Sequence, residues 1–198
     1  MKTNLLKSIV FILFFSLIGL GCTKDDEVIY ELQITDENKV LQQEVKGIEF
    51  SFSLLNELGE PAKVFNIGEN FSFQFLIKNK TAESLPFYDY GFYTTDDFLL
   101  VSSGTKNYGK PMKFLNYSIT KEERWIISDG VAGLSVPWHD ERSEFQMMHG
   151  YFEGLKQPYL EKGKYYTKFT YNFTFGYENK TPKIETGKLT FIINFEIK

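Results

Sequence analysis

The chain has 198 residues, of which 22 are basic and 26 acidic, with a formal net charge of −4 at pH 7. That acidic balance disfavours nucleic acid as a partner, and the length suits one domain with a buried core better than two. Cys22 is the only cysteine, so no intrachain disulfide can form and packing must stabilise the fold. Aromatic residues make up 17% of the chain, and such residues favour β-strands.

The first 21 residues have the pattern of a cleaved secretory signal. Lys2 and Lys7 precede an apolar run over residues 9–20, which is too short to span a membrane. The run ends at Gly21-Cys22, which resembles the lipobox of bacterial lipoproteins. The resemblance implies that the cysteine thiol carries a diacylglyceryl group and becomes the mature, membrane-tethered N-terminus. The alternatives are an ordinary signal peptide cut nearby and an uncleaved anchor.

The residues after Cys22 bear on where the anchored protein is carried. A lysine followed by three acids resembles the signal that takes Bacteroidetes-type lipoproteins to the outer face of the outer membrane: Lys24, Asp25, Asp26 and Glu27. The alternatives are a solvated acidic tether and a location on the periplasmic face. Residues 22–45 are interpreted as the lipidated cysteine, the tether and a first strand, and residues 46–198 as the domain.

The first half of the domain alternates Phe or Ile with small polar residues, which predicts strands buried on one face. The pattern is clearest at residues 48–53 and 71–78, with turns and a short strand at Val64-Phe65 between them. Residues 102–111, which contain two glycines and a proline, and residues 128–142 are predicted to be long loops. Further candidate strands fall at residues 28–35, 87–95, 98–102, 114–119, 125–128 and 145–148.

The C-terminal part of the chain predicts a long antiparallel hairpin. Aromatic rings occupy every second position of residues 169–177, so they share one face of a strand. Residues 178–182 break this run, because Pro182 has no N–H to donate to a neighbouring strand. Residues 188–197 alternate in the same way and supply the second strand.

Many short strands with frequent turn signals, and no long amphipathic helix, predict an all-β fold arranged as an antiparallel sandwich. Residues 50–61 and 68–75 resemble the opening of an immunoglobulin-like domain, and residues 158–166 resemble the turn before its closing hairpin. The pattern is similar to sandwiches of surface lipoproteins and of the BsuPI-type proteinase-inhibitor fold. This resemblance implies an immunoglobulin-like β-sandwich over residues 46–198, and it specifies fold better than function.

Catalytic or metal chemistry would depend on His139 and His149, the only histidines. His139 with Asp140 or Glu141, together with His149, could bind a divalent ion. Neighbouring residues of a strand point to opposite faces, however, so a polar surface loop is the favoured interpretation. The sequence contains no nucleophile elbow, zinc-protease motif, phosphate loop or EF-hand spacing. We therefore expect no enzymatic activity, no metal and no cofactor.

Aromatic side chains are the candidate ligand contacts, because Tyr and Trp join a large apolar area to a polar group. The candidates are Tyr88, Tyr90, Trp125, Trp138 and the adjacent His139. The alternative is that these rings fill the core, and this is favoured for the two tyrosines. Both interpretations stand for Trp138, and the contact surface is expected on the predicted loop at residues 128–142.

The predicted function is that of a lipid-anchored, surface-exposed module that binds a glycan or a protein. The export signal, the aromatic content and the lack of catalytic motifs lead to this prediction. The alternatives are a structural subunit of an envelope complex and a proteinase inhibitor. The expected partners are the membrane, through the lipid on Cys22, and an extracellular ligand.

Overall fold

The chain folds into an all-β structure with mainly antiparallel sheets, which confirms the predicted fold class at that level. The computed structural model describes residues 30–33, 39–87, 91–114, 124–140, 148–149, 152–176 and 183–198. The predicted signal peptide, Cys22 and the export segment lie outside these residues, as do Tyr88 and Tyr90. Within the described ranges, no helix is long and apolar enough to cross a membrane.

The first main sheet has four antiparallel strands in the order β11–β5–β3–β2. Their bounds are β2 (Val40–Val45), β3 (Ile48–Leu55), β5 (Ser72–Asn79) and β11 (Val131–Pro137). A tight turn at Lys46-Gly47, with φ of 51° and 79°, joins β2 to β3. Phe52 lies opposite Phe75 in the β3–β5 register, so the alternating rings of both strands share the inner face.

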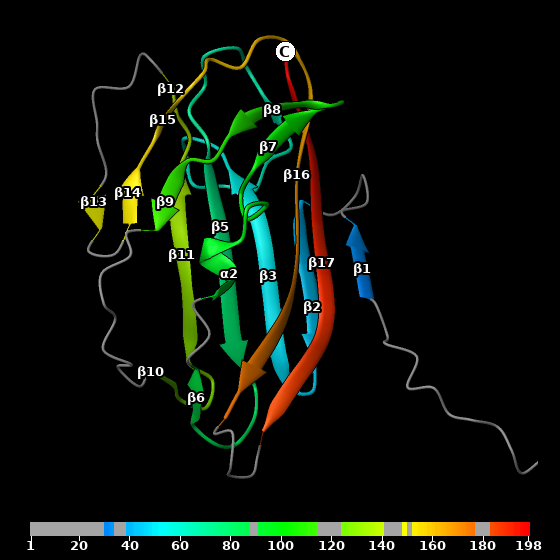
Figure 1. The fold of residues 1–198 in the computed structure, drawn as a ribbon, viewed down its shortest axis with the longest axis vertical. Helices are drawn as coiled ribbons and strands as arrows, with labels where there is room; N and C mark the ends of the chain where they lie inside the picture. Colours follow the sequence, from blue (N-terminus) through cyan, green and yellow to red (C-terminus); the bar gives the residue numbers. More distant parts are fainter. Residues whose placement is uncertain are drawn as a thin grey trace, which may run out of the picture.

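The second main sheet is built on a long antiparallel hairpin, which confirms the predicted C-terminal pair of strands. Its strands are β1 (Tyr30–Gln33), β4 (Val64–Phe65), β7 (Val101–Ser103), β8 (Lys106–Gly109), β16 (Gly163–Phe175) and β17 (Ile184–Ile197). The β7–β8 hairpin extends the sheet beyond β16, whereas β1 and β4 run parallel to β17 along its other edge. Figure 1 shows β1 beside β17 at one side of the molecule.

Small sheets close the ends and one side of the molecule (Figure 1). Their strands are β6 (Leu85–Phe87) with β10 (Arg124–Ile126), β12 (His139–Asp140) with β15 (Lys156–Gln157), and β9 (Met112–Phe114) with β14 (Phe152–Gly154) and β13 (Met148–His149). One short helix, α2 (Gly91–Thr94), lies between β6 and β7. Its Phe92 is fully buried, so the helix adds an aromatic ring to the core.

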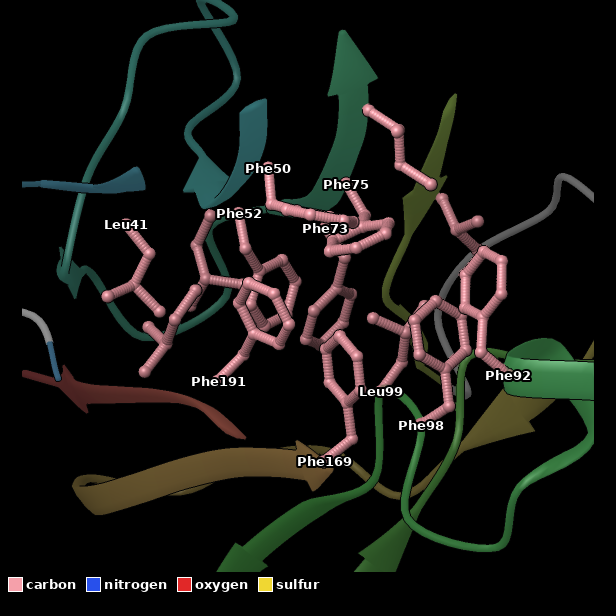
Figure 2. Close-up of a cluster of buried hydrophobic side chains, with 14 of the residues drawn as sticks. Leu41, Phe50, Phe52, Phe73, Phe75, Phe92, Phe98, Leu99, Phe169 and Phe191 are labelled. Atoms are coloured by element: carbon pink, nitrogen blue, oxygen red, sulfur yellow. The ribbon is translucent and has the colours of Figure 1, made fainter. Parts of the chain in front are cut away.

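Phenylalanine rings from the two main sheets meet in the core (Figure 2). Phe50 of β3 lies 4.7 Å from Phe173 of β16 between ring centroids, and Phe75 of β5 lies 5.4 Å from Phe191 of β17. Most of these pairs are tilted or edge-on, the geometries that aromatic rings prefer. The rings predicted to share one face at Phe169, Phe173 and Phe175 are buried here.

The prediction of a loop over residues 128–142 is wrong, because β11 occupies residues 131–137 and pairs with β5 throughout. Ala132 and Leu134 pack against the core and Val136 is buried in it, so the strand has an inner face like its neighbours. A Cβ at Gly133 would lie 2.3 Å from the Phe75 carbonyl oxygen, so only glycine fits there. A segment that contains alanine, glycine, serine and proline thus forms a strand that propensity alone does not indicate.

Several more elements differ from the sequence-based expectations. Residues 102–111 contain the β7–β8 hairpin instead of a long loop, with its turn at Gly104. Residues 87–95 are not one strand, because the chain leaves β6 and forms α2. The strand expected from residue 98 begins only at Val101, since Leu99 adopts a φ of 58°. Strand β2 was not predicted, because little besides Leu41 and Val45 is buried along it.

Candidate functional site

Trp138 belongs to the core, which decides between the two interpretations that the sequence left open for it. Its side chain is 5% exposed and stacks on Phe71, with ring centroids 6.0 Å apart and an interplanar angle of 8°. The backbone N–H of Trp138 donates to the Phe71 carbonyl at 2.8 Å, which continues the pairing of β11 with the start of β5. This pairing turns the indole inward, and the alternative in which the ring fills the core is the one observed.

His139 is also buried, with 8% of its surface exposed. Burial lowers the pKa of its imidazole, and the neighbouring Asp140 partly opposes that shift. No cluster of three metal-ligating residues occurs in the part of the chain that the structure describes. Because His139 is buried, it offers little surface for direct contact with a large ligand.

Trp125 is the one sequence-predicted contact residue that the structure places at the surface, with 47% of its side chain exposed. It lies on β10, at the opposite end of the molecule from the β7–β8 hairpin (Figure 1). The described part of the chain therefore does not bring Trp125, Trp138 and His139 together in one site. Tyr88 and Tyr90 lie outside it.

A groove of about 510 Å³ crosses the outer face of the second sheet near the C-terminal end of β17. Its floor comes from two cross-strand pairs of the β16–β17 hairpin, Lys164 with Glu196 and Tyr166 with Asn194. Gly104 of the β7–β8 turn forms one rim, and residues 63–64 at β4 form the other. This volume lies in the range of small-molecule sites in proteins, about 300–1,000 Å³.

Hydrogen bonds hold the two rims of the groove against its floor. The Tyr166 hydroxyl donates to the Gly104 carbonyl at 3.3 Å, which fixes the ring beside the β7–β8 turn. The Ser103 hydroxyl donates to the Lys164 carbonyl at 2.7 Å. On the other side, the Glu196 N–H donates to the Lys63 carbonyl at 2.8 Å. The groove is therefore shaped by backbone pairing as well as by side chains.

The groove carries an aromatic ring, an amide and charged groups of both signs. Lys63 and Lys164 contribute two positive charges and Glu196 one negative charge, and the Lys198 ammonium lies 3.9 Å from the Glu196 carboxylate.

No family model, curated protein or solved structure matches this chain. The chemistry of this groove is therefore the feature from which we infer a function.

Sequence reasoning missed the groove, although one signal for it was present. Tyr165 and Tyr166 are adjacent on a strand, so only one of them can face the core. The inward rings at Phe169 and Phe173 have odd numbers, which places Tyr165 inside and Tyr166 outside, as observed. The rims could not be found in this way, because they come from strands distant in sequence.

Because its pKa is raised, we expect Tyr165, directly beneath the groove, to make the stability of the domain depend on pH in the alkaline range. Its hydroxyl donates to the Glu161 carbonyl at 2.8 Å, and burial, assisted by Tyr108, raises its pKa to about 12. A tyrosine in the unfolded chain titrates near pH 10, so the fold favours the protonated phenol. This contribution, on the order of 2–3 kcal/mol, is complete below about pH 10 and is lost as the pH rises toward 12.

Urea unfolding across this pH range tests the assignment. Tyr165→Phe should remove part of the alkaline loss of stability, because the substituted ring cannot ionise. Tyr166→Phe, the same change on the outer face, should keep the wild-type pH dependence. Equal pH profiles for the two variants would contradict the role given to Tyr165.

Proposed function

We propose that this chain is an exported, lipid-anchored protein of the bacterial outer membrane that binds a glycan in the groove on its immunoglobulin-like β-sandwich. The predicted signal peptide and Cys22 support the location. Residues 24–27, which resemble a surface-export signal, support display outside the cell. The observation that carries the binding function is the groove at Tyr166. Its mixture of one ring, one amide and several charges matches the chemistry of sugar recognition.

A sugar ring presents apolar C–H groups on its faces and hydroxyls around its edge. The half-buried ring of Tyr166 can pack against such a face, while the exposed Asn194 amide can both donate to and accept from hydroxyls. Lys63 and Lys164 outnumber Glu196, so a glycan that carries carboxylates should be preferred to a neutral one. The groove lies open on the sheet, which suits a polymer that extends beyond it.

Affinity electrophoresis of the purified chain in gels containing polygalacturonate or dextran tests this function. We expect retardation by polygalacturonate, weaker retardation by dextran, and a loss of affinity of at least about 10-fold in Tyr166→Ala. Trp125→Ala is the matched control, because it removes an exposed ring far from the groove and should bind as the wild type does. Unchanged affinity in Tyr166→Ala would show that the groove is not the site.

A protein ligand is the second candidate, and exposed apolar side chains beside the groove favour it. Leu58 is 81% exposed, and Val64 and Ile67 are also exposed. Hydrogen bonds from Asn70 to the Glu57 carboxylate, both 3.0 Å long, hold the turns that carry Leu58 and Ile67 together. Stoichiometric co-purification of an envelope protein, abolished by Leu58→Glu, would indicate a subunit of a complex instead of a glycan-binding module.

A further inference from the structure

Three exposed apolar side chains gather in one short stretch at the end of the sandwich opposite the groove. Trp125 of β10, Ile127 and Val131 are 47%, 63% and 58% exposed. Trp125 lies on β10, which pairs with β6, whereas Ile127 follows β10 and Val131 begins β11. The Pro86 carbonyl of β6 accepts a 2.8 Å hydrogen bond from the N–H of Gly176, the residue after β16. The stretch therefore lies where β16 ends and β17 begins, at the bottom of Figure 1.

The chain enters the sandwich on the half nearest this end. β1 runs parallel to β17, with Tyr30 opposite Leu189, the fifth residue after the start of β17 at Ile184. Measured along β17 at a rise of about 3.3 Å per residue, Tyr30 lies about 17 Å from the Ile184 end of the hairpin. Ile197 is the eighth residue after Leu189, so the groove end is about 26 Å away in the other direction.

The length of the tether between Cys22 and Tyr30 favours one end of the sandwich as the end nearer the membrane. Tyr30 is the eighth residue after Cys22, so the extended tether spans at most about 26–29 Å. This length exceeds by about 10 Å the distance along β17 from Tyr30 to the Ile184 end of the hairpin. The groove end could meet the same membrane only if the tether were stretched along nearly its whole length, which is entropically unfavourable.

We propose that Trp125, Ile127 and Val131 form a docking face for the interfacial region of the lipid bilayer. This face holds the sandwich end-on, with the groove directed away from the membrane; the inference rests on the proposed anchor at Cys22. Tryptophan favours the membrane interface, where its ring is in apolar surroundings and its N–H remains hydrated. The exposed Asp129 in the same turn limits insertion to the headgroup region, because a carboxylate is not carried into hydrocarbon.

Tryptophan fluorescence of the acylated full chain in phosphatidylethanolamine–phosphatidylglycerol vesicles tests the proposal. The chain has two tryptophans, so Trp138→Phe leaves Trp125 as the reporter and Trp125→Phe leaves the buried Trp138 as its control. With lipids that carry a nitroxide near the headgroup, we expect Trp125 to lose at least about two-fold in emission and Trp138 to be little affected.

Charge substitutions separate docking from anchoring. Ile127→Glu combined with Val131→Glu should restore Trp125 emission while the chain still floats with the vesicles through its lipid. Leu58→Glu, at an exposed apolar residue of the opposite end, should leave the quenching unchanged. A floating chain with unquenched Trp125, or with both tryptophans quenched equally, would overturn the docking face and leave the anchor intact. A chain that does not float would overturn both.

Discussion

Replacing Phe75 with alanine is expected to lower the free energy of unfolding by about 3–5 kcal/mol. Phe75 is fully buried at the centre of the aromatic core (Figure 2), with centroid distances of 5.4–6.4 Å to its neighbours. These neighbours come from both main sheets and from the segment containing α2: Phe50, Phe52, Phe92, Phe98, Phe169, Phe173 and Phe191. The substitution would leave a cavity that rings held by three elements cannot close by moving together.

Equilibrium unfolding in guanidinium chloride measures this loss, and two variants calibrate it. Phe75→Leu keeps most of the buried volume and should cost clearly less than the alanine variant. Tyr166→Ala removes a ring from the outer face of the second sheet, so it should change stability little. If Phe75→Ala cost no more than Tyr166→Ala, the two sheets would not be held together by this core.

The main strands could be predicted from the sequence because burial on one face imposes a period of two residues. Phe50 and Phe52 of β3, and the odd-numbered rings of β16, show this period without interruption. Strand β11 could not be predicted in the same way, because its inner residues are aliphatic rather than aromatic and only a glycine fits at Gly133 against the backbone of β5. That requirement arises from a partner strand far away in sequence.

The candidate site was harder to predict than the fold. The outward position of Tyr166 follows from strand alternation, but a groove also needs Gly104 and residues 63–64 beside it, and those neighbours depend on which strands pair. Trp138 illustrates the reverse error, since polar neighbours in sequence indicated a surface loop whereas pairing with Phe71 turns it inward. The lipid anchor and the export signal remain sequence predictions.

The groove and the proposed docking face lie at opposite ends of the β16–β17 hairpin, so docking of one end would direct the groove away from the membrane. A hairpin of 13 and 14 residues spans roughly 45 Å, so a ligand in the groove would be held well clear of the membrane surface. The covalently continuous strands make that separation rigid, because bending the hairpin would break its pairing and its packed aromatic face. Length and stiffness are the properties expected of a module that presents a binding site outward.

Asn79→Asp is the second substitution with a large expected effect, because Asn79 holds the turn that carries the docking face. Its side chain is fully buried, and Nδ2 donates to the Glu83 carbonyl at 2.7 Å and to the Ile126 carbonyl at 2.8 Å. Its backbone N–H donates to the Gly130 carbonyl at 3.0 Å. An aspartate would keep the two Thr81 donors to Oδ1, but its second oxygen would lie against two carbonyl oxygens, so we expect a loss of about 3–5 kcal/mol at neutral pH.

The size and the pH dependence of this loss distinguish a buried charge from a general effect of the substitution. Burial should raise the pKa of the introduced carboxyl, so the loss should grow as the pH rises from about 4 and shrink in acid, where the protonated group can donate once. Asn172→Asp, the same change at an exposed position of β16, should cost little at either pH. Hydrogen exchange should rise first at residues 124–131, because the amide of Asn79 ties Ile126 to the end of β5. Uniform exchange across both sheets, or equal losses in the two variants, would mean that Asn79 does not organise this end of the molecule.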